Sequence, residues 1–283
     1  MKDILFSDMR NEIELEISNI FEKMEETNIT NAMKYSIIGS AGKRIRPILL
    51  LECYRMLKGE YKKAIPFAIS VEMLHTYSLI HDDLPCMDDD NMRRGKPSNH
   101  IMFGESTALL AGDALLTLAF ENMTNQIKKV EPDRVLRSIN CLSSLSGYDG
   151  MIKGQMIDLN NENKNVSLDE LNQMNILKTA KLMIASCKIG CILASGNEDQ
   201  IRAVEEYGKN LGIAFQIVDD ILDSGEQSDS KNLKSTYVGI LGIEKSRQLA
   251  KMYTNKAIDS LIIFGERAEN LKELSLDLEK RII

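Results

Sequence analysis

The chain has few prolines and no apolar run long enough to cross a bilayer. Its five prolines all lie at or before Pro132. Because proline breaks helices, the remainder of the chain favours long helices. The most apolar window, Met183 to Gly196, contains Lys188 and is shorter than the roughly 20 residues of a membrane helix. No Gly-, Ser- or Pro-rich linker divides the 283 residues, so we expect a single domain over residues 1–283 without a transmembrane segment.

Cysteines are few, and acidic residues outnumber basic ones. The cysteine count of five is odd, and the N-terminus lacks the layout of a signal peptide, which indicates a reduced, cytoplasmic protein. Cys187 and Cys191 share a helical face but have no further ligands nearby in sequence, so core packing is favoured over a zinc site. The net charge of −7 argues against a general nucleic-acid or anionic-membrane surface.

What the chain does have is helical periodicity. Apolar residues recur at three- and four-residue spacing, which predicts an all-α helical bundle. The segments are 4–21, 45–57, 64–80, 106–123, 168–193, 201–222 and 234–264. Segments 64–80 and 212–222 are apolar around most of their circumference, so we expect them at the centre. Breaks are expected at 39–42, 91–99, 160–166 and 224–232, with Ser167 as a helix cap.

Two acidic clusters end these central helices. In the second cluster, Asp219 and Asp223 lie four residues apart, a repulsive pair on a helix that costs roughly 0.2–0.5 kcal/mol unless it is compensated. A cation is the natural compensation, and oxygen ligands without a Cys/His quartet suit Mg²⁺, which also binds substrate phosphates. For the first cluster, taken alone, a solvated acidic helix end is the alternative interpretation.

The first cluster spans residues 81–90 and contains Asp82, Asp83 and Asp88. Asp82 and Asp88 would lie about 120° apart on a regular helix. Pro85 lies between them and should distort or end the helix, so that Asp88 could return toward the face of Asp82. We therefore expect the two clusters to hold a metal-bridged diphosphate between two helices.

Two groups of basic residues frame the first cluster. Lys43, Arg44 and Arg46 follow Gly42 at a helix start, where free backbone N–H groups also favour an anion. Arg93 and Arg94 follow the acidic residues directly, and guanidinium groups match phosphate oxygens. Either group alone could be a surface charge run. His75 suits a hydrogen bond to a phosphate, although a core histidine is the alternative.

These motifs resemble those of the trans-isoprenyl diphosphate synthases, most closely the bacterial farnesyl diphosphate synthases. The matching strings, in the family's order, are GKRIRP (42–47), LIHDDLPCMDDDNMRRGKP (79–97), GQMIDL (154–159), LKT (177–179), FQIVDDILD (215–223) and KSTY (234–237). The resemblance covers residues from about 30 to 250.

The resemblance implies an all-α isoprenoid synthase fold and a Mg²⁺-dependent, head-to-tail condensation of isopentenyl diphosphate with an allylic diphosphate. It also implies a homodimer. Three magnesium ions would be held by Asp82, Asp83, Asp88, Asp219 and Asp223. Isopentenyl diphosphate would be bound by Gly42, Lys43, Arg46, His75 and Arg94, and the allylic diphosphate by Arg93, Lys178 and Lys234. Thr179 and Gln216 would face the carbocation.

Product length depends on the residues before the first cluster. Tyr77 lies five residues before Asp82, about 7–8 Å along a helix, and Ser78 follows it. In the family, an aromatic residue there tends to stop elongation at fifteen carbons, so the resemblance favours farnesyl over geranylgeranyl diphosphate. Ordinary core packing of Tyr77 is the alternative.

The chain departs from the family pattern between Asp223 and Lys234, where the loop is short and a second Gly-Lys pair is missing. Two other functions compete. A terpene cyclase shares the fold and metal chemistry but needs no second diphosphate site, which the basic residues here oppose. A non-catalytic subunit of a heteromeric synthase is favoured by the short loop and opposed by the two intact aspartate motifs.

Overall fold

The computed structural model describes residues 6–38, 42–224 and 235–282. The first half contains α1 (Ser7–Glu22), α2 (Asn28–Ile37), α3 (Ile45–Lys58), α4 (Ile65–Asp82), the short strands β1 (Met92–Arg93) and β2 (Lys96–Pro97), α5 (Asn99–Phe103), α6 (Glu105–Thr124) and α7 (Pro132–Ser146). The second half contains α8 (Met151–Asn160), α9 (Leu168–Asn175), a π-helical turn (Ile176–Ala180), α10 (Lys181–Leu193), α11 (Glu198–Asp223), α12 (Tyr237–Leu241), α13 (Ile243–Ser260) and α14 (Glu269–Glu279). Short 3₁₀ turns cover Lys62–Ala64, Ile262–Ala268 and Lys280–Ile282.

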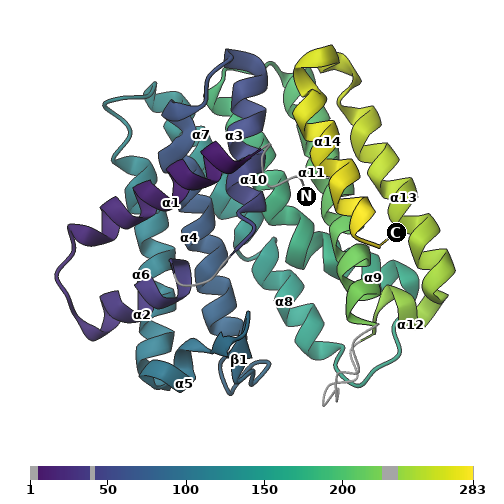
Figure 1. Ribbon diagram of the computed structural model, residues 1–283, viewed down its shortest axis with the longest axis horizontal. Helices are drawn as coiled ribbons and strands as arrows, with labels where there is room; N and C mark the ends of the chain where they lie inside the picture. Colours follow the sequence, from purple (N-terminus) through teal and green to yellow (C-terminus); the bar gives the residue numbers. More distant parts are fainter. Residues whose placement is uncertain (1–5, 39–41, 225–234, 283) are drawn as a thin grey trace.

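The all-α prediction is confirmed. The two strands form a single antiparallel pair, with Met92 opposite Pro97, and every other regular element of the described residues is helical. In Figure 1, α10 and α11 run through the middle of the molecule, with α6 toward one end and α13 toward the other. The two aspartate clusters lie at the ends of α4 and α11 as predicted.

The apolar side chains of α10 explain its central position. α10 is buried around nearly its whole circumference, including Cys187 and Cys191 at 0% exposure, as expected for a helix that is apolar on all sides. Gly190 lets α10 pack closely against α3, because a Cβ there would lie 2.2 Å from the carbonyl oxygen of Leu50. The predicted packing role of the two cysteines is therefore confirmed.

Several boundaries differ from the prediction. The segment 234–264 is not one helix, because Gly242 adopts a left-handed φ of 78° between α12 and α13, a conformation that favours glycine. The segment 168–193 contains the π-helical turn between α9 and α10. Five helices, α2, α5, α7, α8 and α14, were not predicted at all. Ser167 does cap α9, since its hydroxyl accepts a bond from the Glu170 amide at 3.3 Å.

Arg44 has a structural role at the start of α3. It caps the helix with a left-handed φ of 50°, and its guanidinium group is buried. It lies 2.6 Å from Glu14 and 2.5 Å from Glu72, and it also donates to the carbonyl of Ile37. Arg44 thus ties α1, α2 and α4 to the start of α3, because its guanidinium group donates to acceptors on these three helices.

None of the helices in the described residues has the length and apolar character that a membrane crossing requires.

Candidate active site

The first aspartate cluster folds back on itself at the end of α4. The helix ends at Asp82, and the backbone amide of Asp88 donates to the carbonyl oxygen of Asp82 at 2.9 Å. Pro85 lies within this turn, whose inner bonds run from Leu84 to His81 and from Met87 to Leu84. The backbone at Asp88 therefore folds back onto Asp82, as the predicted return requires.

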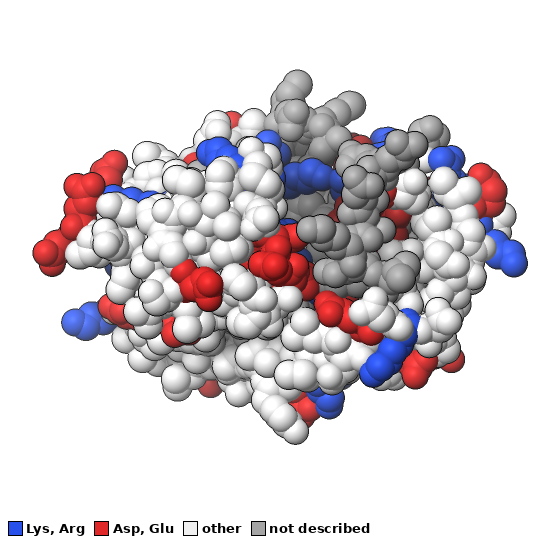
Figure 2. Space-filling model, turned by 90° about the horizontal axis from the view of Figure 1, so that it is seen from below, with Lys and Arg blue, Asp and Glu red and all other residues white. Residues whose placement is uncertain are grey.

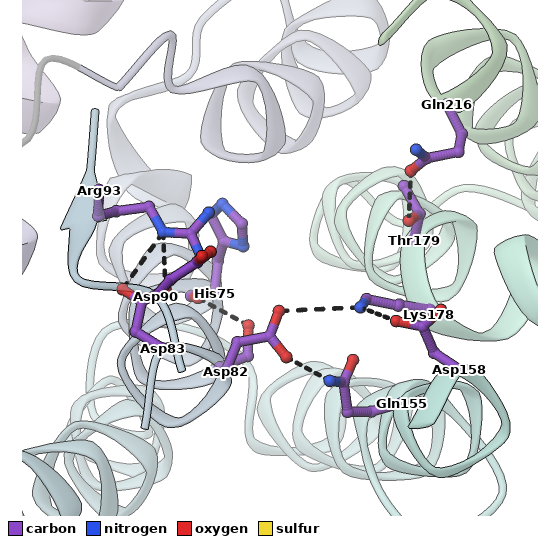
Figure 3. Close-up of polar contacts among 11 residues, drawn as sticks. His75, Asp82, Asp83, Asp90, Arg93, Gln155, Asp158, Lys178, Thr179 and Gln216 are labelled. Carbon is purple, nitrogen blue, oxygen red and sulfur yellow. Dashed lines mark hydrogen bonds and ion pairs between the residues drawn. The ribbon is translucent and has the colours of Figure 1, made fainter. Parts of the chain in front are cut away.

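Asp82 faces two polar side chains from other helices. Gln155 of α8 donates to its Oδ1, and the Nζ of Lys178 lies 3.8 Å from its Oδ2. Lys178 also forms a closer ion pair with Asp158, at 2.6 Å. Figure 3 shows these side chains converging from opposite sides. A predicted metal ligand and a predicted allylic-diphosphate ligand thus share one site.

A glycine allows this convergence. A Cβ at Gly154 would lie 2.2 Å from the backbone nitrogen of Lys178, so only glycine lets α8 pack this closely against the π-helical turn. Such turns are frequent at functional sites, and this one presents Lys178 and Thr179. Sequence reasoning assigned no role to Gln155 or Asp158. The Gly-Gln-x-x-Asp pattern in the 154–159 string was the one sequence signal that could have pointed to these two residues.

Asp83 has a different environment from Asp82. It is 3% exposed, and both of its oxygens accept bonds from Arg93. Burial raises the pKa of Asp83, while the bond and charge of Arg93 oppose this rise. Arg93 also lies 3.4 Å from Asp90. Asp83 and Arg93 therefore neutralise each other, and neither lines the two cavities described next.

The predicted isopentenyl diphosphate ligands come together around one cavity. This basic cavity has a volume of about 310 Å³. Its lining includes all five of those residues, Gly42, Lys43, Arg46, His75 and Arg94, together with Glu72, Phe215 and Asp219. Gly42 allows the close approach of Arg94, because a Cβ there would lie 2.8 Å from the guanidinium Nη1.

The charges of the basic cavity suit an anion. Burial lowers the pKa of Arg46 to about 10, with Arg94 lowering it further and Glu72 and Asp219 opposing this. Burial and the neighbouring Arg46 and Arg94 lower the pKa of His75 well below its ordinary value, so its ring is neutral. The ring lies 3.2 Å from Arg46. Among the described residues, the buried Nε of Arg46 has no hydrogen-bond partner, as expected of a group whose partner is a ligand.

A second, more apolar cavity adjoins the first. This apolar cavity has a volume of about 460 Å³ and shares Arg46 and His75 with the basic cavity. Asp82, Lys178 and Thr179 line it, and so do Tyr77 and Ser78, the predicted length-determining residues. Tyr77 is 6% exposed, and its ring meets the edge of His81 at 5.6 Å between centroids. In Figure 2, acidic and basic side chains gather around a hollow on the face seen from below.

The second aspartate cluster reaches the same region from α11. Asp219 lines the basic cavity, and its Oδ1 lies 3.2 Å from the guanidinium of Arg281. Burial raises the pKa of Asp219, Arg281 and Lys43 lower it, and Asp223 raises it again. Sequence reasoning assigned no role in the site to Arg281. Lys234 lies outside the described residues, as does most of the shortened loop before it.

Asp220 does not line either cavity. Its Oδ2 accepts from the Tyr237 amide at 2.8 Å and its Oδ1 from Gln216 at 3.1 Å. Gln216 in turn accepts from the hydroxyl of Thr179 at 3.2 Å, as Figure 3 shows. Gly212 allows this pairing, since a Cβ there would lie 2.5 Å from that of Ala180.

The donor atoms fit a hard cation. Asp82 and Asp219 line the two adjoining cavities, and burial with Asp223 nearby destabilises the charge of Asp219. Among the described residues, no three His, Cys, Asp or Glu side chains already converge as a metal site. Mg²⁺ is usually bound by one or two carboxylates together with substrate phosphates and water, and Asp82 and Asp219 are oxygen donors of this kind.

Comparison with known proteins identifies the family. Residues 26–260 match the family described as polyprenyl synthetase. This chain belongs to the polyprenyl synthetase family. It is therefore related to the trans-prenyl synthases, as its motifs predicted, and the terpene cyclase alternative is wrong.

Individual members of the polyprenyl synthetase family are similar over most of their length. Farnesyl diphosphate synthase of Micrococcus luteus is 44% identical over 258 residues, 88% of each chain. The heterodimeric geranylgeranyl pyrophosphate synthase large subunit 1 of Arabidopsis thaliana is 42% identical over 85% of this chain and 68% of its own. The structure of a FPP/GFPP synthase from Zymomonas mobilis superposes with a TM-score of 0.87 at 34% identity, covering 97% of this chain and 98% of the other.

Proposed function

We propose that this protein condenses isopentenyl diphosphate with dimethylallyl or geranyl diphosphate to give farnesyl diphosphate. One observation supports this above the others. The cavity lined by Asp219 and the basic residues adjoins the cavity lined by Asp82, and both share Arg46 and His75. Two diphosphates could therefore bind side by side, with an apolar space for the growing chain.

Isopentenyl diphosphate would occupy the basic cavity. Arg46 offers a buried N–H that has no partner in the part of the chain that the structure describes, and Lys43 and Arg94 line the same space. Neutral His75 can donate one hydrogen bond to a phosphate oxygen without adding charge. This placement would direct the five-carbon tail toward the apolar cavity.

The allylic diphosphate would lie near Lys178 and Asp82. Three Mg²⁺ ions would be held by Asp82, Asp83, Asp88, Asp219 and Asp223. When bound, such ions neutralise the charge that develops on a departing diphosphate. To bind Mg²⁺, Asp83 would have to give up its hydrogen bonds to Arg93. Arg93 would then be able to contact the allylic diphosphate. Lys234 remains a proposed ligand of the same group.

Thr179 and Gln216 would stabilise the carbocation. Their oxygens form a hydrogen-bonded pair, and Thr179 lines the apolar cavity. Oriented dipoles stabilise positive charge in a site from which water is excluded, and amide and hydroxyl groups are weak nucleophiles. The diphosphate released in the first step would accept the final proton.

Tyr77 supports a fifteen-carbon product, because its ring and Ser78 line the apolar cavity on the side away from Asp82 along α4. The relatives include both farnesyl and geranylgeranyl synthases at similar identity, so geranylgeranyl diphosphate is the alternative product. The large-subunit relative also keeps a heteromeric assembly as a second possibility.

A homodimer is supported by exposed apolar side chains beside the apolar cavity. Ile152 and Met156 of α8 line this cavity and are 50% and 56% exposed. Leu109 and Leu110 of α6 are 46% and 50% exposed. Exposed apolar groups of this kind mark association surfaces. Light scattering after size-exclusion chromatography should give twice the mass of one chain.

The decisive experiment supplies purified protein with Mg²⁺, isopentenyl diphosphate and either dimethylallyl or geranyl diphosphate, followed by chromatography of the product. We expect farnesyl diphosphate from the wild type. Asp82→Ala and Asp219→Ala should abolish turnover while circular dichroism remains unchanged. An inactive wild type would favour the non-catalytic subunit, and a twenty-carbon product would refute the role given to Tyr77.

A further inference from the structure

Asp220 differs from the other two aspartates of its cluster. Asp219 and Asp223 lie four residues apart on α11, and Asp219 lines the basic cavity. Asp220 is rotated by about 100° from Asp219 and shares its side of the helix with Gln216, four residues earlier. Each of its two oxygens accepts a bond from the protein, from the Tyr237 amide at 2.8 Å and from Gln216 at 3.1 Å.

These two bonds determine which way the Gln216 amide points. A carboxylate can only accept hydrogen bonds, so the NH₂ group of Gln216 must face Asp220. The oxygen of Gln216 is thereby turned to Thr179, whose hydroxyl donates to it at 3.2 Å. Thr179 lines the apolar cavity. A chain of three hydrogen bonds therefore runs from the start of α12 through Asp220 and Gln216 to the cavity wall.

We propose that Asp220 is a positioning residue that orients the Gln216 amide and holds the start of α12 against α11, and that it does not ligate a metal ion. This inference deepens the proposed function and rests on it, because Gln216 and Thr179 are the groups proposed to face the carbocation. Asp220 acts on the reaction only through them.

The hydrogen-bond pattern suggests a swap that tests the proposal. In Asp220→Asn, one oxygen can still accept from Tyr237, but the new NH₂ faces the NH₂ of Gln216. Gln216 must then turn over, and its oxygen no longer faces Thr179. Adding Gln216→Glu supplies two acceptor oxygens at position 216. One can accept from the new amide group at position 220, and the other can accept from the hydroxyl of Thr179. The double variant also has the same net charge as the wild type.

The assay compares D220N, Q216E and the double variant with the wild type at saturating Mg²⁺. We expect the kcat of D220N to fall about tenfold or more, as for other residues that orient a reactive group, with little change in the KM for isopentenyl diphosphate. The double variant should be more active than either single variant. Asp259→Asn, which removes an exposed carboxylate from α13, should behave as wild type.

Three outcomes would overturn the proposal. D220N could keep the wild-type kcat, or the double variant could be no better than D220N. In a separate Mg²⁺ titration, D220N could need more Mg²⁺ than the wild type for half-maximal turnover, as loss of a metal ligand would cause. Thermal melting of the same four proteins gives a readout that needs no turnover, and the double variant should regain the melting temperature lost by D220N. If the wild type is inactive, the proposed function is refuted. The melting comparison then still tests the hydrogen-bond network, because it does not depend on turnover.

Discussion

The guanidinium group of Arg281, two residues before the C-terminal residue of the chain, lies 3.2 Å from the carboxylate of Asp219 on α11. The two residues are 62 positions apart in sequence. Ile282, next to Arg281, is 7% exposed and packs in the cluster that includes Ile217 and Ile221 of α11. This packing holds Arg281 beside a proposed metal ligand.

We predict that Arg281 competes with Mg²⁺ for Asp219. Arg281→Gln should lower the Mg²⁺ concentration that gives half-maximal turnover, because the carboxylate loses a neighbouring positive charge. Mg²⁺ titration of the condensation rate measures this. Lys280→Gln is the matched control, since Lys280 pairs with Asp277 on the same turn. An Arg281→Gln titration identical to that of the control would contradict the prediction.

The length of the product should depend on the ring of Tyr77. Tyr77→Ala removes a bulky group from the wall of the apolar cavity, and we expect a larger fraction of twenty-carbon and longer products. Tyr77→Phe keeps the ring and should retain the wild-type product. Chromatography of the products from isopentenyl and geranyl diphosphate distinguishes these outcomes. An unchanged product from Tyr77→Ala would support the core-packing interpretation instead.

Gly154 should be essential for the arrangement of Lys178. Since a Cβ at Gly154 would lie 2.2 Å from a backbone nitrogen, Gly154→Ala must separate α8 from the π-helical turn. We expect a loss of turnover of about tenfold or more, because misplacement by 1 Å can cost about a hundredfold. Gly239→Ala is a suitable control, since its Cβ would meet only the Thr236 hydroxyl at 3.2 Å. Equal rates for the two variants would be the contrary result.

The sequence predicted the site better than it predicted the helices around it. Asp82, Arg46 and His75 were found because carboxylates and basic groups next to apolar helices require an explanation. α7 and α8 were not predicted, although α8 supplies Gln155 to the site. The apolar pattern of α8 is weak, since only Met151, Gly154 and Asp158 are buried, and its position depends on contacts with other helices.

Pairings between residues far apart in the chain could not be predicted from the sequence either. Nothing in the local pattern distinguishes Arg44, whose guanidinium group is paired with Glu14 and Glu72, from Arg46, whose buried Nε has no hydrogen-bond partner among the described residues. Both are arginines at one helix start, and the fold of α1 and α4 separates their roles. The same holds for Asp219 and Asp220, neighbours that face different surroundings.

Arg44 should be among the most important residues for stability. Arg44→Gln leaves Glu72, which is 3% exposed, without its cation, and breaking a buried pair costs about 3–5 kcal/mol. Urea unfolding measures the loss. Arg202→Gln is the control, because its pair with Asp199 is exposed and such pairs contribute about 0–1 kcal/mol. A loss as small as in this control would show that Arg46 and Arg94, which also interact with Glu72, compensate its charge.

Glu52 of α3 should make stability depend on pH. Burial raises its pKa from 4.5 to about 7, although Arg55 opposes this. Between these two pH values the folded protein binds a proton at Glu52 that the unfolded chain has released. The contribution of Glu52 to the free energy of unfolding should therefore be full below about pH 4.5 and decline as the pH rises to about 7.

The variant Glu52→Gln isolates this effect, because it removes the titrating group while keeping a similar shape. As the pH rises from 4.5 to about 7, the wild type should lose unfolding free energy relative to the variant. The relative loss should be on the order of 3 kcal/mol. Urea unfolding of both proteins at several pH values from 4.5 to 8 measures it. Curves that stay parallel would mean that Arg55, 2.8 Å from Glu52, and Asn270 of α14, 3.3 Å away, keep the carboxylate charged in the folded state.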